Sequence, residues 1–169
     1  MTRPDASEHA PYYGKYIALV PETDVIGAME SQLSATLGHL RALPSGSGKK
    51  RYAPGKWSVC EVVGHMIDTE RVFSQRALFF ARSAPGALPG MEQDDWNKAS
   101  AYDAADLGEL IAEFEHTRKS NMLMFTHLSP EAWSRRGVGS GVEFTVRALA
   151  YIIVGHERHH IEILRTRYA

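Results

Sequence analysis

The sequence predicts an all-α fold, a four-helix bundle that forms a single domain over residues 1–169. Four long stretches carry apolar residues at steps of three and four, which is the spacing of an amphipathic helix. Alternating apolar and polar residues, the pattern of a half-buried strand, are almost absent. The composition agrees, because 169 residues with 44% apolar and 23% charged side chains are typical of one globular domain.

The first predicted helix covers residues 23–43. Its apolar stripe consists of Ile26, Met29, Leu33, Leu37 and Leu40. Pro44 and the Ser/Gly run after it end the helix and begin a flexible connection.

The second predicted helix covers residues 58–82 and has a well-marked start. The Ser58 hydroxyl can cap the free amides while Glu61 reaches back, which together form a capping box. His65 lies on the apolar side of this helix, so one imidazole is predicted to point into the bundle.

Residues 83–102 form a long predicted loop that contains Pro85, Gly86, Pro89 and Gly90. A helix of about 25 residues is roughly 37 Å long, and this loop can run back along all of it. The second and third helices are therefore predicted to run parallel.

The third predicted helix begins with Asp103 as its N-cap and ends near residues 129–130. Its apolar stripe includes Leu107, Leu110, Ile111, Phe114, Asn121, Phe125 and Leu128. One short helical turn with Trp133 follows, and then residues 137–141, a Gly-rich segment that is predicted to form a turn or a short hairpin.

The fourth predicted helix covers residues 145–168 and carries two histidines on its core-facing stripe, His156 and His160. Residues four apart on a helix have their β-carbons about 5–6 Å apart, so these imidazoles can point at one ion. His65 is the candidate third ligand. Three protein ligands with water in the remaining position are typical of a catalytic metal site.

A simpler interpretation is that each histidine is a core residue that hydrogen-bonds to a neighbour. Three buried rings without a shared partner, however, leave several polar nitrogens unsatisfied, at about 1–3 kcal/mol each. A shared ion removes most of that cost. The spacing does not place His65 at the level of His156 and His160, so the residues alone leave both interpretations open.

Composition excludes several classes of function. A net charge of −1 offers no basic face for nucleic acid. Cys60 is the single cysteine, which rules out an internal disulfide, fits a reducing cytoplasm and is an unlikely nucleophile. The N-terminal residues contain no apolar run long enough for a signal peptide or a membrane span, so neither export nor a membrane partner is expected.

Two histidine motifs carry a resemblance to a known family. They are Trp57-Ser58 with Gly64-His65-Met66-Ile67-Asp68-Thr69-Glu70-Arg71 and Arg76, and later Gly155-His156-Glu157-Arg158-His159-His160. With the helix order and the long second loop, they make most of the chain similar to the DinB/YfiT-like superfamily. The resemblance implies an up-down-down-up bundle, usually a homodimer, that binds nickel, zinc or another divalent ion. Position by position, the family's metal ligands fall on His65, His156 and His160.

Residues around these ligands have two interpretations each. Asp68 either supports a ligand ring or takes part in acid–base chemistry as a catalytic residue, or it is an ordinary solvated carboxylate. Glu70, Arg71 and Arg76 are predicted to form ion pairs along the helix or between helices. His159 points about 100° away from its neighbour His160, so it is expected outside the ligand set. Glu157 is likewise a weaker candidate. The aromatic residues Trp57, Trp96, Tyr102 and Trp133 either line the mouth of the site or pack.

The reaction follows from the resemblance alone. The superfamily includes transferases and isomerases that use low-molecular-weight thiols such as bacillithiol or mycothiol, and other members are described as metal-dependent hydrolases. We predict a metal-dependent enzyme with a small-molecule substrate, a thiol S-transferase in preference to a hydrolase. The alternative is a non-catalytic, stress-related binding protein in which the metal organises a pocket or holds two helices together.

Overall fold

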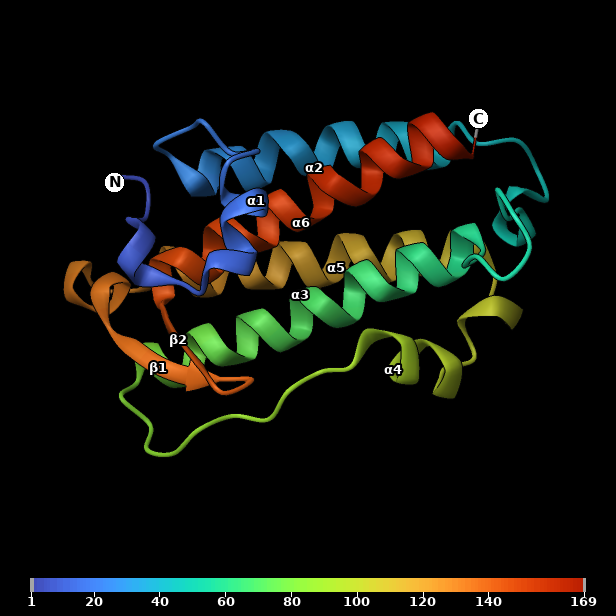
Figure 1. The fold of residues 1–169 in the computed structure, drawn as a ribbon. Helices are drawn as coiled ribbons and strands as arrows, with labels where there is room; N and C mark the ends of the chain where they lie inside the picture. The colour runs from blue at the N-terminus through green and yellow to red at the C-terminus, as the bar shows by residue number, and fades with distance from the viewer. Residues whose placement is uncertain (1, 169) are drawn as a thin grey trace.

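Four long helices form the body of the protein, for which a computed structural model describes residues 2–168. They are α2 (Val25–Arg41), α3 (Val59–Ala81), α5 (Leu107–Thr126) and α6 (Val146–Arg167). Figure 1 shows that α2 and α6 run in one direction and α3 and α5 in the other. α3 packs between α5 and α6, and α2 contacts the same two helices. The predicted up-down-down-up bundle is therefore confirmed.

The segment between α3 and α5 runs back along the bundle, which lets these two helices lie parallel (Figure 1). It differs from the predicted bare loop, because it contains the short helix α4 (Gln93–Ala99) and the 3₁₀ turn η4 (Tyr102–Ala104). A local helix of seven residues carries too little periodicity to stand out in the sequence.

The predicted start of the third helix is wrong by one turn. Asp106 is the N-cap, and its carboxylate accepts the Glu109 amide at 3.0 Å. Asp103 instead lies in η4 and forms an ion pair with Arg51 at 2.8 Å. Both aspartates are good N-cap residues, so capping preference alone does not distinguish between them.

A β-hairpin precedes α6, as the Gly-rich segment predicted. Strand β1 (Arg136–Gly139) pairs antiparallel with β2 (Val142–Thr145). Both turn residues, Ser140 and Gly141, have positive φ angles of 54° and 73°, as in the two-residue turns that match the twist of a hairpin. Leu88 adds an isolated parallel bridge to Gly139, which fastens the long connection to the hairpin.

The remaining elements are short and lie outside the four long helices. They are η1 (Ala6–Glu8), η2 (Pro11–Tyr13), α1 (Gly14–Ile17), η3 (Ser47–Lys49) and η5 (Pro130–Ser134). Of these, α1 packs against α6, while η1 contacts β2. Helix α1 therefore covers a face of the helix that carries two of the histidines.

The bundle core has two apolar clusters with a polar layer between them. One cluster gathers around Phe73, Phe125 and Leu149, and the other around Met66, Phe114 and Ile161. Along each of α3, α5 and α6, buried polar residues separate the two clusters. Within residues 2–168, no helix combines the length and apolar character that a membrane span requires.

Candidate metal centre

The structure brings the three predicted histidines together from two neighbouring antiparallel helices. His65 extends from α3, and His156 and His160 lie one turn apart on α6. The Nε2 atom of His156 lies 3.0 Å from Nε2 of His65 and 3.1 Å from Nε2 of His160. One ring nitrogen from each residue therefore points at a common position.

Glycines next to two of the ligand positions let other segments approach closely. A Cβ at Gly64 would lie 2.2 Å from the ring of Tyr102. A Cβ at Gly155 would lie 2.0 Å from the backbone oxygen of Tyr16. The Gly-His pair in each motif therefore combines a candidate ligand with a close packing contact.

Burial keeps the three imidazoles neutral at neutral pH, which is the form that binds a metal. Burial lowers the pKa of His65 to about 4. Burial, and then the other imidazoles, lower the pKa of His156 and His160 well below the ordinary value.

The donor set fits a divalent ion. A neutral imidazole has one N–H and one lone pair, so three Nε2 atoms at one point cannot all hydrogen-bond to one another. Three lone pairs directed at one ion satisfy all of them at once. Zinc–nitrogen bonds of about 2.0–2.1 Å suit such a close group of nitrogens.

Aromatic rings hold two of the histidines in place. The Trp57 ring packs on His65 with centroids 4.9 Å apart, and the Tyr16 ring packs edge-on against His156 at 5.4 Å. Trp57 thus contacts the site, whereas Trp133 stacks on Phe125 away from it.

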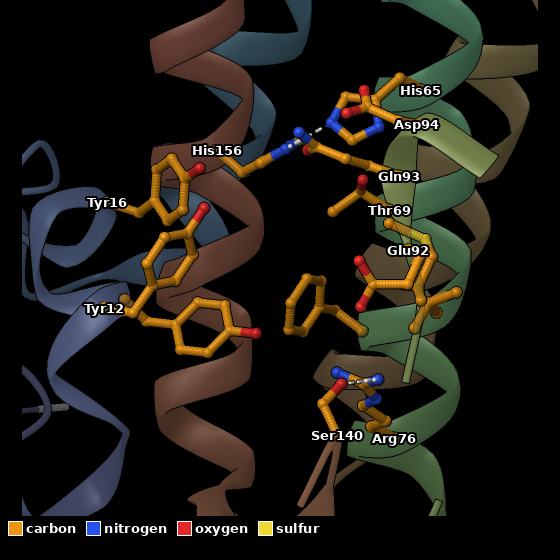
Figure 2. Close-up of a pocket in the computed structure, with 14 residues that line it drawn as sticks. Tyr12, Tyr16, His65, Thr69, Arg76, Glu92, Gln93, Asp94, Ser140 and His156 are labelled. Atoms are coloured by element: carbon orange, nitrogen blue, oxygen red, sulfur yellow. Dashed lines mark hydrogen bonds between the residues drawn. The ribbon is translucent and has the colours of Figure 1, made fainter. Parts of the chain in front are cut away.

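A cavity of about 350 Å³ opens beside His65 and His156. Figure 2 shows these two histidines at one end of the cavity and Arg76 with Ser140 at the other. Thr69 lies between the two ends along α3, and tyrosines from the N-terminal segment form the opposite wall (Figure 2). The cavity is large enough for a small organic molecule.

A second cavity, of about 440 Å³, lies against His160 and Trp57. Gln93 and Asp94, at the start of α4, line both cavities. The short helix that the sequence did not predict therefore contributes residues to both cavities.

Asp68 lies about one turn after His65, but its carboxylate contacts Tyr102 and not one of the three histidines. Its carboxylate accepts a hydrogen bond from the Tyr102 hydroxyl at 2.7 Å. Burial raises the pKa of Asp68, and the hydrogen bond from Tyr102 partly offsets this. His159 packs on Tyr16 and does not join the three converging nitrogens.

Glu157 belongs to a buried charge network that the sequence pattern missed. Arg118 of α5 is fully buried and forms ion pairs with Glu70 at 2.8 Å and with Glu157 at 2.7 Å. Asn121 donates to Glu70 and Thr36 to Glu157. The network joins all four long helices. Its one signal in the sequence is that Arg118 falls on the inward stripe of α5 at helical spacing.

Two of the three residues of α3 that were predicted to form ion pairs do so, and the third does not. Glu70 pairs with Arg118, and Arg71 pairs with Glu113 at 2.7 Å, so both join α3 to α5. Arg76 forms no ion pair in the part of the chain that the structure describes, so that prediction is wrong. Arg76 lines the cavity instead.

Comparison with known proteins gives two matches. The sequence model of the DinB superfamily matches residues 28–164, which contain all three histidines. Among solved structures the chain is similar to YfiT from Bacillus subtilis, described as "a probable metal-dependent hydrolase with an unusual four-helix bundle topology". The TM-score is 0.70, over 96% of this chain and 91% of that one, and the 18% identity supports the shared fold alone. Among curated proteins no match is found.

Proposed function

Because the chain belongs to the DinB superfamily, we propose that it is a metal-dependent enzyme in which His65, His156 and His160 hold one divalent ion, nickel or zinc. The observation that carries the proposal is the convergence of three Nε2 atoms, from two buried histidines and the half-buried His160, within 4.8 Å of one another beside an open cavity. Three protein ligands leave a position for a reacting group, which is the pattern of a catalytic site.

The residues around the site have separate tasks in this proposal. The histidines hold the ion through Nε2, and the rings of Trp57 and Tyr16 restrict their rotation. When bound, a divalent ion acts as a Lewis acid and lowers the pKa of a water or thiol. The cavity admits a small molecule to the same position.

The first reaction class that we propose is transfer of a low-molecular-weight thiol, of the bacillithiol or mycothiol type, to an electrophile. To test it, metal-loaded protein is incubated with each thiol and monochlorobimane, and conjugate fluorescence is followed. Metal-dependent conjugation that disappears in His160→Ala is the expected result. The absence of metal-dependent conjugation with either thiol would contradict this reaction class.

Hydrolysis is the second candidate, and the likeness to YfiT, described as a probable metal-dependent hydrolase, favours it. A panel of p-nitrophenyl esters and an amide, assayed without any thiol, tests this class. Metal-dependent release of p-nitrophenol that is independent of thiol would support hydrolysis over transfer.

A non-catalytic role is supported by the position of the histidines on two helices, because an ion held there would link α3 to α6. In that case His160→Ala lowers the melting temperature sharply while no activity is found with or without metal.

Light scattering after gel filtration tests the homodimer that the resemblance implies.

A further inference from the structure

Arg76 is a buried cation at the far end of the cavity from the histidines. Its side chain lines the cavity, and the residue is 2% exposed. Nη2 donates to the Pro89 oxygen and to the Ser140 hydroxyl, each at 2.8 Å. Nε has no hydrogen-bond partner in the described part of the chain. Burial lowers the pKa of Arg76, but a guanidinium remains protonated at neutral pH.

The second buried arginine of the bundle shows what Arg76 lacks. Arg118 has two carboxylates as partners, Glu70 and Glu157. Arg76 has only uncharged partners, Pro89 and Ser140. Two carboxylates, Glu92 and Asp94, line the same cavity, but both residues are exposed and neither pairs with Arg76. A buried charge without a counter-ion is unfavourable. Because Arg76 faces a cavity, a bound ligand can supply the missing negative charge.

The structure around Arg76 is shaped to hold the guanidinium. A Cβ at Gly139 would lie 2.8 Å from Nε, so the hairpin closes directly on this side chain. The left-handed backbone of Ser140, with φ of 54°, is part of the turn that presents its hydroxyl to Nη2. Thr69, between Arg76 and His65 on α3, has a buried hydroxyl with no partner among the described residues.

We propose that Arg76 binds an oxyanion, a carboxylate or phosphate group, of the small molecule that reacts at the three histidines. This inference rests on the proposed function, because it assigns a substrate class to the same site. Arg76 follows His65 by about three helical turns, or roughly 16 Å along α3. The substrate is therefore an elongated molecule whose anionic end lies away from the reacting end, as the cavity in Figure 2 extends.

Isothermal titration of the full-length, metal-loaded protein with succinate and with inorganic phosphate tests the proposal. We expect saturable binding of one anion per chain, and the tighter of the two identifies the chemical class. Arg76→Met should raise the dissociation constant by about tenfold or more, because a charge-assisted hydrogen bond is lost. Metal content, measured by elemental analysis, should remain that of the wild type.

Three controls separate the anion site from the metal site. Arg71→Met removes an exposed arginine of the same helix that does not line the cavity, and it should leave anion binding unchanged. Arg76→Lys keeps the charge without the planar fork and should bind more weakly than the wild type but more tightly than Arg76→Met. His160 does not line this cavity, so His160→Ala should lose metal and keep anion binding.

Several results would overturn the proposal. They are failure of both anions to bind the wild type, unchanged binding by folded Arg76→Met, and loss of anion binding together with metal in His160→Ala. If Arg76→Met does not fold, as circular dichroism would show, anion binding by Arg76→Lys equal to that of the wild type would overturn it. Failure of the metal proposal alone leaves anion binding intact, so the two failures are distinguishable.

Discussion

The Nε and Nη2 atoms of Arg118 donate to the two carboxylate oxygens of Glu70, at 2.8 and 2.9 Å, in the centre of the bundle. Glu157, the other partner of Arg118, directly follows His156 in α6. Burial by itself would lower the pKa of Arg118. The carboxylates of Glu157 and Glu70 outweigh this effect and raise the pKa. The network therefore connects α5 to both helices that carry the histidines.

Arg118→Met should be strongly destabilising, because it leaves two carboxylates buried without their cation. We expect the free energy of unfolding to fall by about 3–5 kcal/mol, measured by urea denaturation at pH 7. The triple variant with Glu70→Gln, Arg118→Met and Glu157→Gln removes all three charges and should recover most of this loss. A single variant as stable as the wild type would contradict the prediction.

Arg118 also shows why part of the site was not predictable from the sequence. Helical spacing places it on the inward stripe between Phe114 and Asn121, but an arginine is rarely fully buried. Its burial depends on Glu70 and Glu157, which come from other helices. Periodicity within one helix identifies a face and does not identify the partners that this face meets.

His160→Ala should lower the affinity for zinc and nickel by about a hundredfold or more, since it removes one of three converging nitrogens. Elemental analysis of protein purified without a nickel column, followed by metal titration, measures the effect. His159→Ala is the matched control, because that ring lies 5.1 Å from the His160 ring and outside the three-nitrogen group. Equal metal content in the two variants would argue against a three-histidine site.

Lowering the pH should begin to destabilise the metal-free protein at pH values above those at which most carboxylates titrate. Burial lowers the pKa of His65 from 6.5 to about 4, so the folded protein binds fewer protons than the unfolded chain. The stability that depends on this difference is complete above pH 6.5 and is lost as the pH falls towards 4. For His65 the loss is about 2 kcal/mol at pH 5.

Urea denaturation in EDTA at pH 7, 6 and 5 tests this pH dependence. His65→Gln has no titratable ring at this position and should show a smaller decrease than the wild type. Bound zinc should oppose the decrease while it stays bound, because it occupies the neutral form. A free energy of unfolding that does not change between pH 7 and pH 5 would contradict the prediction.

The helices were predictable wherever local chemistry determines them. The capping box of Ser58 and Glu61 correctly predicts the start of α3, since both of its hydrogen bonds form within one turn. The walls of the cavity were not predictable in this way. Tyr12 and Tyr16 lie in short elements with no measurable period, and only tertiary packing brings them to the histidines.

Gly155→Ala should destabilise the protein by about 1–3 kcal/mol, because the new Cβ overlaps the Tyr16 backbone. The overlap is at 2.0 Å, and rotation of a side chain cannot relieve it. Gly38→Ala is the matched control in the last turn of α2, where no atom lies within 4 Å of the new Cβ. It should gain about 0.5–1 kcal/mol from helix propensity. Equal stability of the two variants in urea would contradict the predicted packing.

The sequence left the role of Asp68 open, and substitutions of Asp68 and Tyr102 can test it. Its hydrogen bond comes from Tyr102, so we expect Asp68 to position that ring and not a metal ligand. Asp68→Asn keeps an oxygen acceptor and should leave the zinc affinity unchanged, while Tyr102→Phe should cost about 1 kcal/mol of stability. If Asp68 instead orients His65, Asp68→Asn would lower the zinc affinity by about 10–100-fold and Tyr102→Phe would not.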